Sequence, residues 1–502
     1  MYSVTPETIK YADNIAGSKY GLCELTLMKN AARACFNDLY GKLSANDKIV
    51  ILCGKGNNGG DGYELCRILK KEWFNAVCVN VFDCLPTTDT AICVYKKFLS
   101  QGGKVITCDD ATSVIENATV IIDAVFGVGF YGAIREDSSL GNLITLCNSK
   151  DNCLRVAIDV PSGINSENGR TDGVVFDAHI TLTLAFYKTG TLSYPAKKFC
   201  GDIKLLKIGF PCELEESVPK HALIPDMDYV KGVLPKRPSD SHKGSFGHLL
   251  MFCASRFMTG ACILAANAAL RSGVGLVSVA RDEQTLSILQ HHLTEPVFIP
   301  VDTGNTVGIE NLISLSKKAS ALLMGCGLGK HQNDKNAVFS LIKQAECPII
   351  LDADGINDIS ENTMLLKEAK QVAILTPHPL EFSRLTGKSV DEIQADRINL
   401  ALDFAKNYSC VLILKGASTV IAGPHGELSV CTRGNAGLSK GGSGDVLAGL
   451  CASLRAQSMS AFDSAVCAVY LHAAAGDILE KQISQRGFIP SDLPLVISKL
   501  LS

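Results

Sequence analysis

The stretch NAGLSKGGSGDVLAGL, residues 435–450, is the segment around which the rest of this chain is organised. Its glycines, Gly441, Gly442 and Gly444, let backbone N–H groups approach an anion without side chains in the way. The apolar residues that follow have helical spacing, and a helix beginning there adds unpaired N–H donors and a positive dipole end. The pattern predicts a phosphate cradle in which Asp445 accepts a proton from an attacking hydroxyl. The alternative is a glycine-rich turn in which Asp445 only caps the helix.

The composition is that of a soluble globular protein. A chain of 502 residues predicts two or three domains, and the hydrophobic and charged fractions are 47% and 20%. The net charge of −3 argues against a nucleic-acid partner. No uninterrupted apolar run reaches the ~18 residues of a membrane span. The N-terminal MYSVTPE has neither a signal-peptide nor a transit-peptide pattern, so we expect a cytoplasmic protein.

The 20 cysteines do not form a metal-binding pattern. No Cys-x-x-Cys pair occurs, and the cysteines are scattered through apolar runs such as residues 49–53. In a reducing compartment cysteines at such positions are small buried hydrophobes, which is the interpretation we favour over a zinc site.

The first half of the chain contains a strand, a glycine turn and a helix in succession. Helical spacing over residues 8–40 precedes the predicted strand Lys48–Cys53, which leads directly into GKGNNGGDG, residues 54–62. This order is typical of dinucleotide binding, although the G-x-G-x-x-G match is weak by itself. The oxygens of Asn57, Asn58 and Asp61 are not part of a plain dehydrogenase pattern, and they suit a cation or a polar ring.

Further polar residues follow later strands of the same half. Asp123 lies in the predicted strand at 120–126, and Asp159 and Ser162 follow the strand at 154–158. The carboxyl ends of parallel strands line the ligand crevice of an α/β sheet, so we expect these side chains to converge with Asn58. The alternative is that each is a turn or capping residue.

The second half repeats the α/β architecture without repeating the sequence. A stretch rich in Pro and charge, residues 211–238, separates the halves and predicts domains at 1–218 and 228–502. Strands and helices then alternate, and polar residues and glycines again gather where the strands end. An alanine-rich helix beginning near residue 259 is expected to pack closely against the sheet.

Together these motifs resemble a known family. Residues 1–218 resemble the NAD(P)H-hydrate epimerase domain, through NNGGD at 57–61, DAVFGVG at 123–129 and DVPSG at 159–163. Residues 228–502 resemble the ribokinase-like NAD(P)H-hydrate dehydratase domain. Its motifs here are KGSFG at 243–247, GCGLG at 325–329, LDAD at 351–354, TPHPLE at 376–381, KGAST at 415–419 and GGSGD at 441–445. The fold class implied is α/β, with an N-terminal Rossmann-like three-layer sandwich and a C-terminal ribokinase-like α/β domain.

The resemblance implies a bifunctional metabolite repair enzyme. The first domain would interconvert the R and S hydrates of NADH and NADPH, and the second would dehydrate the S form at the expense of ADP, giving AMP and phosphate. It implies K⁺ in the first domain and Mg²⁺ in the second, with no nucleic-acid or membrane partner, and a homo-oligomer is expected.

Site residues carry over from the matching motifs. Asp159 and Asp445 are implied to be catalytic. The potassium ligands implied are Asn58, Asp123 and Ser162. The hydrate in the first domain is implied to contact Asn57, Asn58, Gly59, Gly60, Asp61, Gly127, Val128, Gly129, Phe130, Tyr131, Gly132, Ala133 and Asp159. The hydrate contacts implied in the second domain are Ala261, Gly327 or Gly329, His378 and Asp445. The nucleotide contacts implied are Lys415, Gly416, Ala417, Ser418, Thr419 and Gly444.

The chain departs from the family pattern in one place. The family usually has Asn-Pro-Gly-Met-Ala-Thr before Gly-Gly-Ser-Gly-Asp, whereas this chain has NAGLSK at 435–440. Loss of proline loosens the turn, and Lys440 is expected to bring a positive charge within reach of a phosphate. The preference for ADP or ATP is therefore open, as are the preference for the NADH or NADPH hydrate and the oligomeric state.

Two other functions are compatible with parts of the sequence. A small-molecule kinase acting on a vitamin precursor or a sugar would use a similar second domain, but it leaves the first domain without a role. A non-catalytic dinucleotide-binding protein would not need Asp159 and Asp445 in complete motifs.

Overall fold

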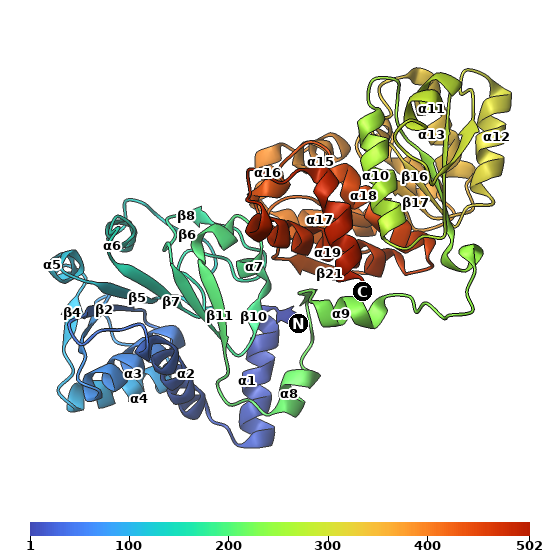
Figure 1. Ribbon diagram of the computed structural model, residues 1–502. Coiled ribbons are helices and arrows are strands. Elements are labelled where there is room, and N and C mark those ends of the chain that lie inside the picture. The colour runs from blue at the N-terminus through green and yellow to red at the C-terminus, as the bar shows by residue number, and fades with distance from the viewer. The chain divides into compact units, whose positions relative to one another are not determined.

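The computed structural model describes residues 1–502 and contains two compact units (Figure 1). One comprises Tyr2–Leu223 and the other Ile224–Ser502 together with Met1. The division falls within the stretch rich in Pro and charge at 211–238.

The N-terminal unit is built on an entirely parallel sheet. In spatial order its strands are β11 (Asp202–Leu206), β9 (Ile180–Leu184), β7 (Leu154–Ile158), β5 (Val120–Ala124), β2 (Lys48–Cys53), β3 (Asn75–Asn80) and β4 (Val105–Thr107). Along β2, Ile49 and Ile51 pack into the core on one face, whereas Val50 and Leu52 pack into the core on the other. Because successive side chains of a strand point to opposite faces, this apolar run requires helices on both sides.

Helices supply both of those layers. The core on one face includes side chains of α2 (Glu24–Tyr40), α3 (Asn57–Lys71) and α4 (Asp89–Ser100), and the core on the other includes side chains of α5 (Ala111–Glu116) and α6 (Ser139–Asn148). The predicted helical stretch 8–40 is two helices, because Gly21 adopts a left-handed conformation (φ 68°) and ends α1 (Pro6–Tyr20). Glycine is the usual residue at such a helix end.

Short elements complete this unit. Strand β1 (Tyr2–Val4) pairs with β10 (Tyr187–Lys188) and with β12 (Ala222–Leu223), and β6 (Ala133–Ile134) pairs with β8 (Asp172–Gly173). The remaining helices are α7 (Thr189–Leu192) and α8 (Cys212–Ser217).

The C-terminal unit is built on a second, larger sheet. In spatial order its strands are β21 (Leu428–Cys431), β20 (Thr419–Ala422), β19 (Val411–Leu414), β18 (Ile374–Leu375), β17 (Ile349–Leu351), β16 (Ala321–Met324), β13 (His248–Phe252), β14 (Leu276–Arg281) and β15 (Val297–Pro300). The strands from β19 to β15 are parallel, so their carboxyl ends share one rim of the sheet.

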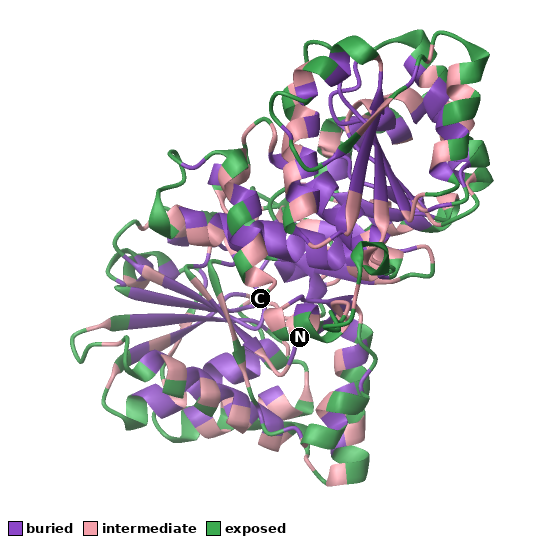
Figure 2. Cartoon of the chain, turned by 45° about the vertical axis from the view of Figure 1, so that its right-hand side comes forward, coloured by how far each residue is buried: buried purple, intermediate pink, exposed green.

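Helices cover this sheet as well, and its strands are largely buried (Figure 2). The helices are α9 (Met227–Val233), α10 (Thr259–Arg271), α11 (Glu283–Leu289), α12 (Thr306–Ser316), α13 (Gln332–Gln344), α14 (Asp354–Ile359), α15 (Pro379–Thr386), α16 (Val390–Ala395), α17 (Arg397–Tyr408), α18 (Ser443–Ala456), α19 (Ala461–Gln482) and α20 (Leu493–Leu500).

The alanine-rich helix α10 has a different main partner from the one predicted. It packs chiefly on α18, and a Cβ atom at Gly449 would lie 2.1 Å from the carbonyl oxygen of Ala265. Small residues therefore allow two helix backbones to approach, and helix α18 itself packs on β13, β16 and β17. This close packing fixes the N-terminus of α18 against the rim of the sheet.

Helix α19 is long and apolar enough to cross a membrane by length and composition alone. However, 78% of its apolar window is buried inside the structure, and α19 packs between α18 and α20. It is therefore a core helix of the C-terminal unit.

Candidate active sites

Three predicted residues of the N-terminal unit meet at the carboxyl ends of β5 and β7. The Asp123 carboxylate accepts hydrogen bonds from the Ser162 hydroxyl at 2.7 Å and from the Ser162 N–H at 2.7 Å. The Asn58 amide, in the first turn of α3, donates to the carbonyls of Phe126 at 2.9 Å and Ile158 at 3.3 Å. Strands distant in sequence thus bring these side chains together.

The Asn58 side chain leaves one polar atom unsatisfied. Its Oδ1 atom is buried and has no hydrogen-bond partner. A buried acceptor without a partner costs free energy, on the order of 1–3 kcal/mol. Amide, carboxylate and hydroxyl oxygens are ligands that suit a hard cation, so the chemistry of these three side chains fits the potassium ion that the resemblance implies.

Asp159 follows β7 and is paired with a residue that the sequence motifs did not indicate. Its carboxylate accepts a hydrogen bond from the ammonium of Lys188, a side chain only 1% exposed. Lys188 also donates to Thr183 Oγ1 at 3.1 Å and to the Leu184 carbonyl at 2.7 Å. The backbone of Asp159 is left-handed (φ 68°), a strained conformation for a residue other than glycine that is common at active sites.

Two more carboxyl groups lie close enough to Asp159 to interact with it. Burial raises the pKa of Asp61 well above its ordinary value, and the charges of Asp159 and Asp13 add to that effect. Burial also raises the pKa of Asp13 to about 6, with Glu24 and Asp159 contributing. Burial and the two neighbouring acids therefore favour the protonated form of Asp61, which can donate a hydrogen bond to a ligand.

Some of the other predicted residues of this unit lie close to the Asn58 and Asp159 side chains, and others do not. Asn57 accepts a hydrogen bond from the Thr88 hydroxyl at 2.5 Å. At Gly59 a Cβ atom would lie 1.9 Å from the Gly54 carbonyl oxygen, and at Gly127 a Cβ would lie 3.5 Å from Asp159 Oδ2. The segment 129–133 is mostly exposed, and no hydrogen bond joins it to the Asn58 and Asp159 side chains.

The glycine-rich stretch of the C-terminal unit forms the predicted loop and helix start. Gly442, left-handed at φ 99°, occupies the N-cap position of α18, and no side chain caps this helix. Asp445 lies in the first turn of α18 and is therefore not its cap, so the alternative interpretation of this residue is wrong. A Cβ atom at Gly444 would lie 3.2 Å from the Lys415 ammonium, so the helix N-terminus and this lysine face the same space.

Burial and a neighbouring carboxylate together disfavour the ionisation of Asp445, although Lys415 and Cys326 act in the opposite direction. Burial raises the pKa of its carboxyl to about 6, and the nearby Asp352 carboxylate adds to that effect. Cys326, Asp352 and Asp445 bring ligand atoms within 4.8 Å of one another. A carboxylate with a raised pKa is a stronger base than an ordinary one, which suits proton abstraction near neutral pH.

Lys415, at the end of β19, is held by two acids. Its ammonium lies 3.0 Å from Asp352 Oδ1 and 3.8 Å from Glu381 Oε2. Burial opposes the charge of Lys415, but Asp352 and Glu381 outweigh it and raise the pKa of the ammonium. The predicted nucleotide lysine therefore stays charged beside the N-terminus of α18, where the two together favour an anion.

His378 and Glu381 both cap helix α15. The Nδ1 atom of His378 accepts from the N–H groups of Leu380 and Glu381, and Glu381 accepts from the His378 N–H at 2.7 Å. Burial and the charge of Lys415 lower the pKa of His378. The Nε2 atom of His378 lies 3.4 Å from Glu381 Oε1, so the ring is held at this helix start and suits orienting a ligand rather than transferring a proton.

The remaining predicted residues flank this centre on the rim. A Cβ at Gly327 would lie 2.9 Å from the Ala261 Cβ, so the two predicted hydrate contacts are adjacent. In the segment 415–419, Thr419 Oγ1 donates to the Gly416 carbonyl at 2.9 Å, and Ser418 is left-handed at φ 53°. The Arg397 guanidinium, 1% exposed, lies beneath this loop and donates to the Leu414 and Lys415 carbonyls.

Contrary to the expectation from the sequence, Lys440 does not point toward the predicted phosphate cradle. Its ammonium donates hydrogen bonds to the carbonyls of Arg486, at 2.8 Å, and Phe488. It also lies 5.2 Å from the centre of the Phe488 ring. Lys440 therefore links the turn at 435–440 by hydrogen bonds to the segment that precedes α20.

Replacing Lys440 with threonine should consequently affect stability more than nucleotide binding. Lys440→Thr removes at least two hydrogen bonds, so we expect a loss of about 1–3 kcal/mol and a melting temperature several degrees lower. The KM for ADP should change less than about twofold. Melting curves and nucleotide titrations of wild type and variant measure both quantities. A KM shift without a change in melting temperature would contradict this assignment.

The site motifs did not single out several residues of these centres. Asp352 and Cys326 lie in the quoted motifs, but no role was assigned to them from the sequence. Their positions directly after β17 and β16 could have indicated that they lie at the site. Lys188 and Asp13 had no motif, and Arg397 is one arginine in an ordinary helical pattern. Only the fold brings these last three residues to the two centres.

Two protein families match this chain, one within each compact unit. The family described as YjeF-related protein N-terminus matches residues 24–190, and the family described as NAD(P)H-hydrate dehydratase matches residues 249–499. A crystal structure of an ADP/ATP-dependent NAD(P)H-hydrate dehydratase from Bacillus subtilis, co-crystallized with ATP/Mg²⁺, is 30% identical. It covers 56% of this chain and 98% of its own, with a TM-score of 0.49.

Relatives of similar length extend the likeness to the whole chain. The bifunctional NAD(P)H-hydrate repair enzyme of Moorella thermoacetica is 32% identical over 98% of this chain and 95% of its own length. The enzyme of the same name from Escherichia coli is 31% identical over 99% of this chain and 94% of its own. The chain therefore belongs to the family of bifunctional NAD(P)H-hydrate repair enzymes.

Proposed function

We propose that the N-terminal unit interconverts the R and S hydrates of NADH and NADPH, and that the C-terminal unit dehydrates the S form with ADP. The observation that carries the proposal is the Asp445 carboxyl, its pKa raised to about 6, at the N-terminus of α18 beside Lys415. A base, a cation and free N–H donors at one point are what phosphoryl transfer to a hydroxyl requires.

The dehydration step follows from this arrangement. Asp445 accepts the proton of the hydroxyl at C6 of the hydrated ring, and that oxygen attacks the terminal phosphoryl group of ADP, which releases AMP. The N–H groups at the start of α18 and the Lys415 ammonium stabilise the charge on the phosphoryl oxygens. The electron pair of the ring nitrogen then expels phosphate, and loss of a proton from the neighbouring carbon restores the reduced nicotinamide.

In the N-terminal unit we propose that Asp159 moves a proton during inversion at C6. The support is its position at the end of β7, near Asp61, a carboxyl whose pKa is raised by burial, and the hydrogen bond that its carboxylate accepts from Lys188. Potassium would be held by Asn58, Asp123 and Ser162, where it would supply a fixed positive charge and orient the turn after β5. The unsatisfied Oδ1 atom of Asn58 supports that assignment.

Magnesium is proposed to enter with the nucleotide. Cys326, Asp352 and Asp445 do not fit a closed magnesium site, because a thiol is too soft a ligand. In addition, Asp352 already accepts hydrogen bonds from Lys415 and Thr376. Magnesium commonly binds through substrate phosphates and a few waters, where it neutralises charge.

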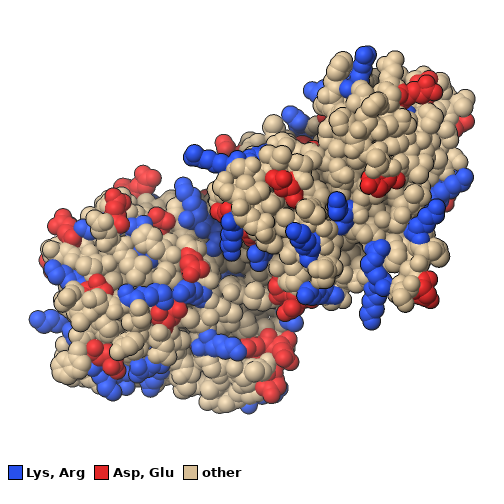
Figure 3. Space-filling view, viewed as in Figure 1, with Lys and Arg blue, Asp and Glu red and all other residues tan.

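The substrates proposed are small molecules, and the proposed compartment is the cytoplasm. All twenty cysteines are free thiols, which suits a reducing compartment. On the face shown in Figure 3, acidic and basic side chains are interspersed, which does not favour a nucleic acid. We also propose a homo-oligomer, which light scattering coupled to size-exclusion chromatography tests directly.

A single assay tests the proposed reaction. Hydrated NADH or hydrated NADPH is incubated with the enzyme, Mg²⁺ and either ADP or ATP, and the absorbance of the reduced nicotinamide is followed. We expect absorbance to return, with AMP and phosphate formed when ADP is supplied. A stable phosphoester without recovery of absorbance would indicate a small-molecule kinase instead.

The dehydration rate should depend on pH through Asp445. Because burial raises the pKa of this carboxyl to about 6, the base is protonated and inactive below that pH. We expect kcat/KM for the hydrate to rise with pH, with a midpoint near pH 6, and then to level off. A pH–rate profile from about pH 5 to about pH 9 measures this. A rate that does not fall on the acid side would argue against Asp445 as the base.

A further inference from the structure

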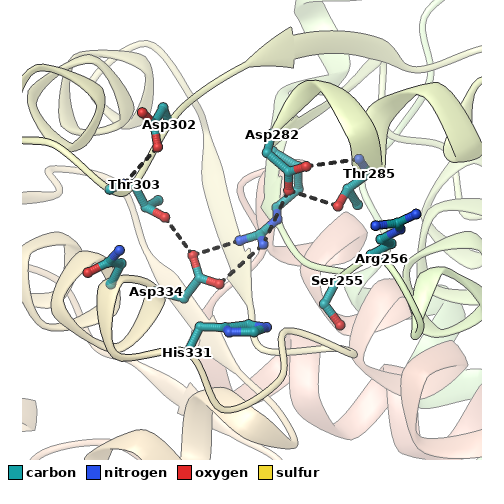
Figure 4. Close-up of a pocket in the computed structure, with 11 residues that line it drawn as sticks. Ser255, Arg256, Asp282, Thr285, Asp302, Thr303, His331 and Asp334 are labelled. Carbon is teal, nitrogen blue, oxygen red and sulfur yellow. Dashed lines mark hydrogen bonds and ion pairs between the residues drawn. The ribbon is translucent and has the colours of Figure 1, made fainter.

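A polar cavity of about 260 Å³ opens on the rim of the C-terminal sheet, at the ends of β13, β14 and β15 (Figure 4). Its lining includes Ser255, Arg256, Arg281, Thr303, His331 and Asp334. Pockets for drug-sized ligands have volumes of about 300–1,000 Å³, so this one suits a fragment such as a phosphate with part of its sugar. None of its residues belongs to the predicted sites.

The acids of this cavity already have partners. Asp334 accepts from Arg281 at 3.0 and 3.2 Å and from Thr303 at 2.8 Å. Asp282 accepts hydrogen bonds from the N–H and the hydroxyl of Thr285, at 3.0 and 2.8 Å. Asp302 accepts hydrogen bonds from the Gly304 N–H and from the Asn305 side-chain amide. The oxygens of these acids are therefore largely occupied by groups of the protein, and the Arg281 guanidinium is shared by Asp334, at 3.0 Å, and Asp282, at 3.7 Å.

The groups left without partners are largely hydrogen-bond donors. Ser255 is only 7% exposed, yet its hydroxyl makes no hydrogen bond. In Figure 4 no dashed line reaches Ser255, Arg256 or His331. His331 is the N-cap residue of α13, a helix of 13 residues, but its side chain does not cap that helix. The Arg256 guanidinium lies 5.6 Å from the centre of the Phe257 ring but has no acid as a partner. Together with a buried hydroxyl and an uncapped helix N-terminus at one cavity, it favours an anion with several oxygens.

The cavity is joined to the reaction centre by the loop Gly325–Gly329. At one end of this loop the Cys326 thiol lies with Asp352 and Asp445. At the other end, a Cβ atom at Gly329 would lie 3.4 Å from Ser255 Oγ and 3.5 Å from the His331 ring. In the strand order of the sheet, β19 lies on one side of β16, and the predicted nucleotide loop follows β19. The strands whose ends form the cavity, β13, β14 and β15, lie on the other side of β16. A hydrate whose ring is at Asp445 can therefore extend away from ADP toward this cavity.

We propose that this cavity binds a phosphate group of the hydrated dinucleotide, through Arg256, Ser255 and the N-terminus of α13. The proposal rests on the proposed dehydratase function, because it assigns the part of the substrate remote from the reacting ring. Two phosphate sources are available: the pyrophosphate, common to both hydrates, and the additional phosphate on the adenosine ribose of hydrated NADPH.

Arg256→Gln in the full chain tests the proposal, because Arg256 is exposed and the variant should fold. We expect KM for the hydrate to rise about tenfold or more, the usual effect of losing a charge-assisted hydrogen bond. The kcat and the KM for ADP should stay within about twofold of wild type. Ser255→Ala should act in the same direction with a smaller effect. Arg271→Gln, an exposed arginine in the last turn of α10, is the matched control and should change neither KM.

The two hydrates distinguish the phosphate sources. A larger KM for hydrated NADPH alone assigns the cavity to the ribose phosphate, and equal increases for both hydrates assign it to the pyrophosphate. Unchanged KM values for both hydrates, or an increase in the KM for ADP alone, would overturn the proposal.

A binding measurement separates this proposal from the proposed function. Calorimetric titration of wild type, Arg256→Gln and Arg271→Gln with NADPH and NADH does not depend on turnover. If the wild-type enzyme does not restore the absorbance of the reduced nicotinamide, the proposed dehydratase function is rejected. Weaker dinucleotide binding by Arg256→Gln, and not by Arg271→Gln, would still support phosphate binding in the cavity. Equal binding by all three proteins, or no binding to wild type, would reject it.

Discussion

Asp445→Asn is expected to lower the dehydration rate by a factor of about 10² to 10⁴, the usual effect of removing a positioned general base. Asparagine has nearly the same shape but cannot accept the hydroxyl proton. Asp445 makes no capping bond at the start of α18, so helix formation does not depend on its charge. Epimerisation should persist, because Asp159 and its partners belong to the other unit.

The same variant should be more stable than wild type near neutral pH. The folded-state pKa of Asp445, about 6, lies above the ordinary value of 3.8, so the folded chain holds this proton more tightly than the unfolded chain. The carboxyl therefore supports folding at low pH and loses that contribution as the pH rises through about 6. A neutral asparagine avoids the buried charge, so the melting temperature of the variant at pH 7.5 should be higher than that of wild type.

The measurement consists of the dehydration rate, the epimerisation rate and a melting curve, all from one purified preparation. Asp391→Asn, an exposed acid in the first turn of α16, is the matched control and should dehydrate at the wild-type rate. A folded Asp445→Asn protein that dehydrates at full rate would remove Asp445 from the mechanism. Loss of both activities would mean that the two units do not act independently.

Asp159→Asn is expected to slow the conversion of R to S hydrate by a factor of about 10² or more. Asparagine tolerates the left-handed backbone of Asp159 better than most residues and keeps an oxygen for the Lys188 ammonium. The negative charge is lost, however, and the buried Lys188 is left with neutral partners only, namely the asparagine oxygen, Thr183 and the Leu184 carbonyl. The melting temperature should therefore fall, because a buried cation loses its counter-charge.

Dehydration of S hydrate by Asp159→Asn should remain at the wild-type rate, which serves as the internal control. Asp109→Asn, an exposed acid in the same unit, controls for a general effect of charge. Epimerisation close to the wild-type rate in a folded Asp159→Asn protein would reduce Asp159 to a binding or structural role.

Sequence patterns located central strands of the N-terminal sheet. The predicted strands at 48–53 and 154–158 coincide with β2 and β7, and the strand predicted at 120–126 ends two residues earlier, as β5. Long apolar runs that end in glycine and polar residues specify a buried parallel strand almost unaided, because both faces must be apolar. The break at Gly21 was less evident, because helical spacing continues on both sides of the glycine.

The partners of the site residues were harder to predict than the residues themselves. Asp159 and Lys188 are 29 residues apart, and they meet because the strands that precede them lie side by side in the sheet. Lys440 was expected near a phosphate from its distance along the chain to the cradle, but the segment after α19 supplies carbonyl groups that hold its ammonium.

By itself the sequence determined the α/β class of both halves, the glycine-rich turn and helix start that contain Asp445, and the polar residues that end the strands. These properties depend on local spacing, on the conformational freedom of glycine and on the apolar faces of strands. Only the tertiary structure decided the raised pKa of Asp445, the pairing of Asp159 with Lys188 and the cavity at Ser255 and Arg256. Each of these depends on which strands are neighbours, since burial and charge act through space between residues that are remote in the chain.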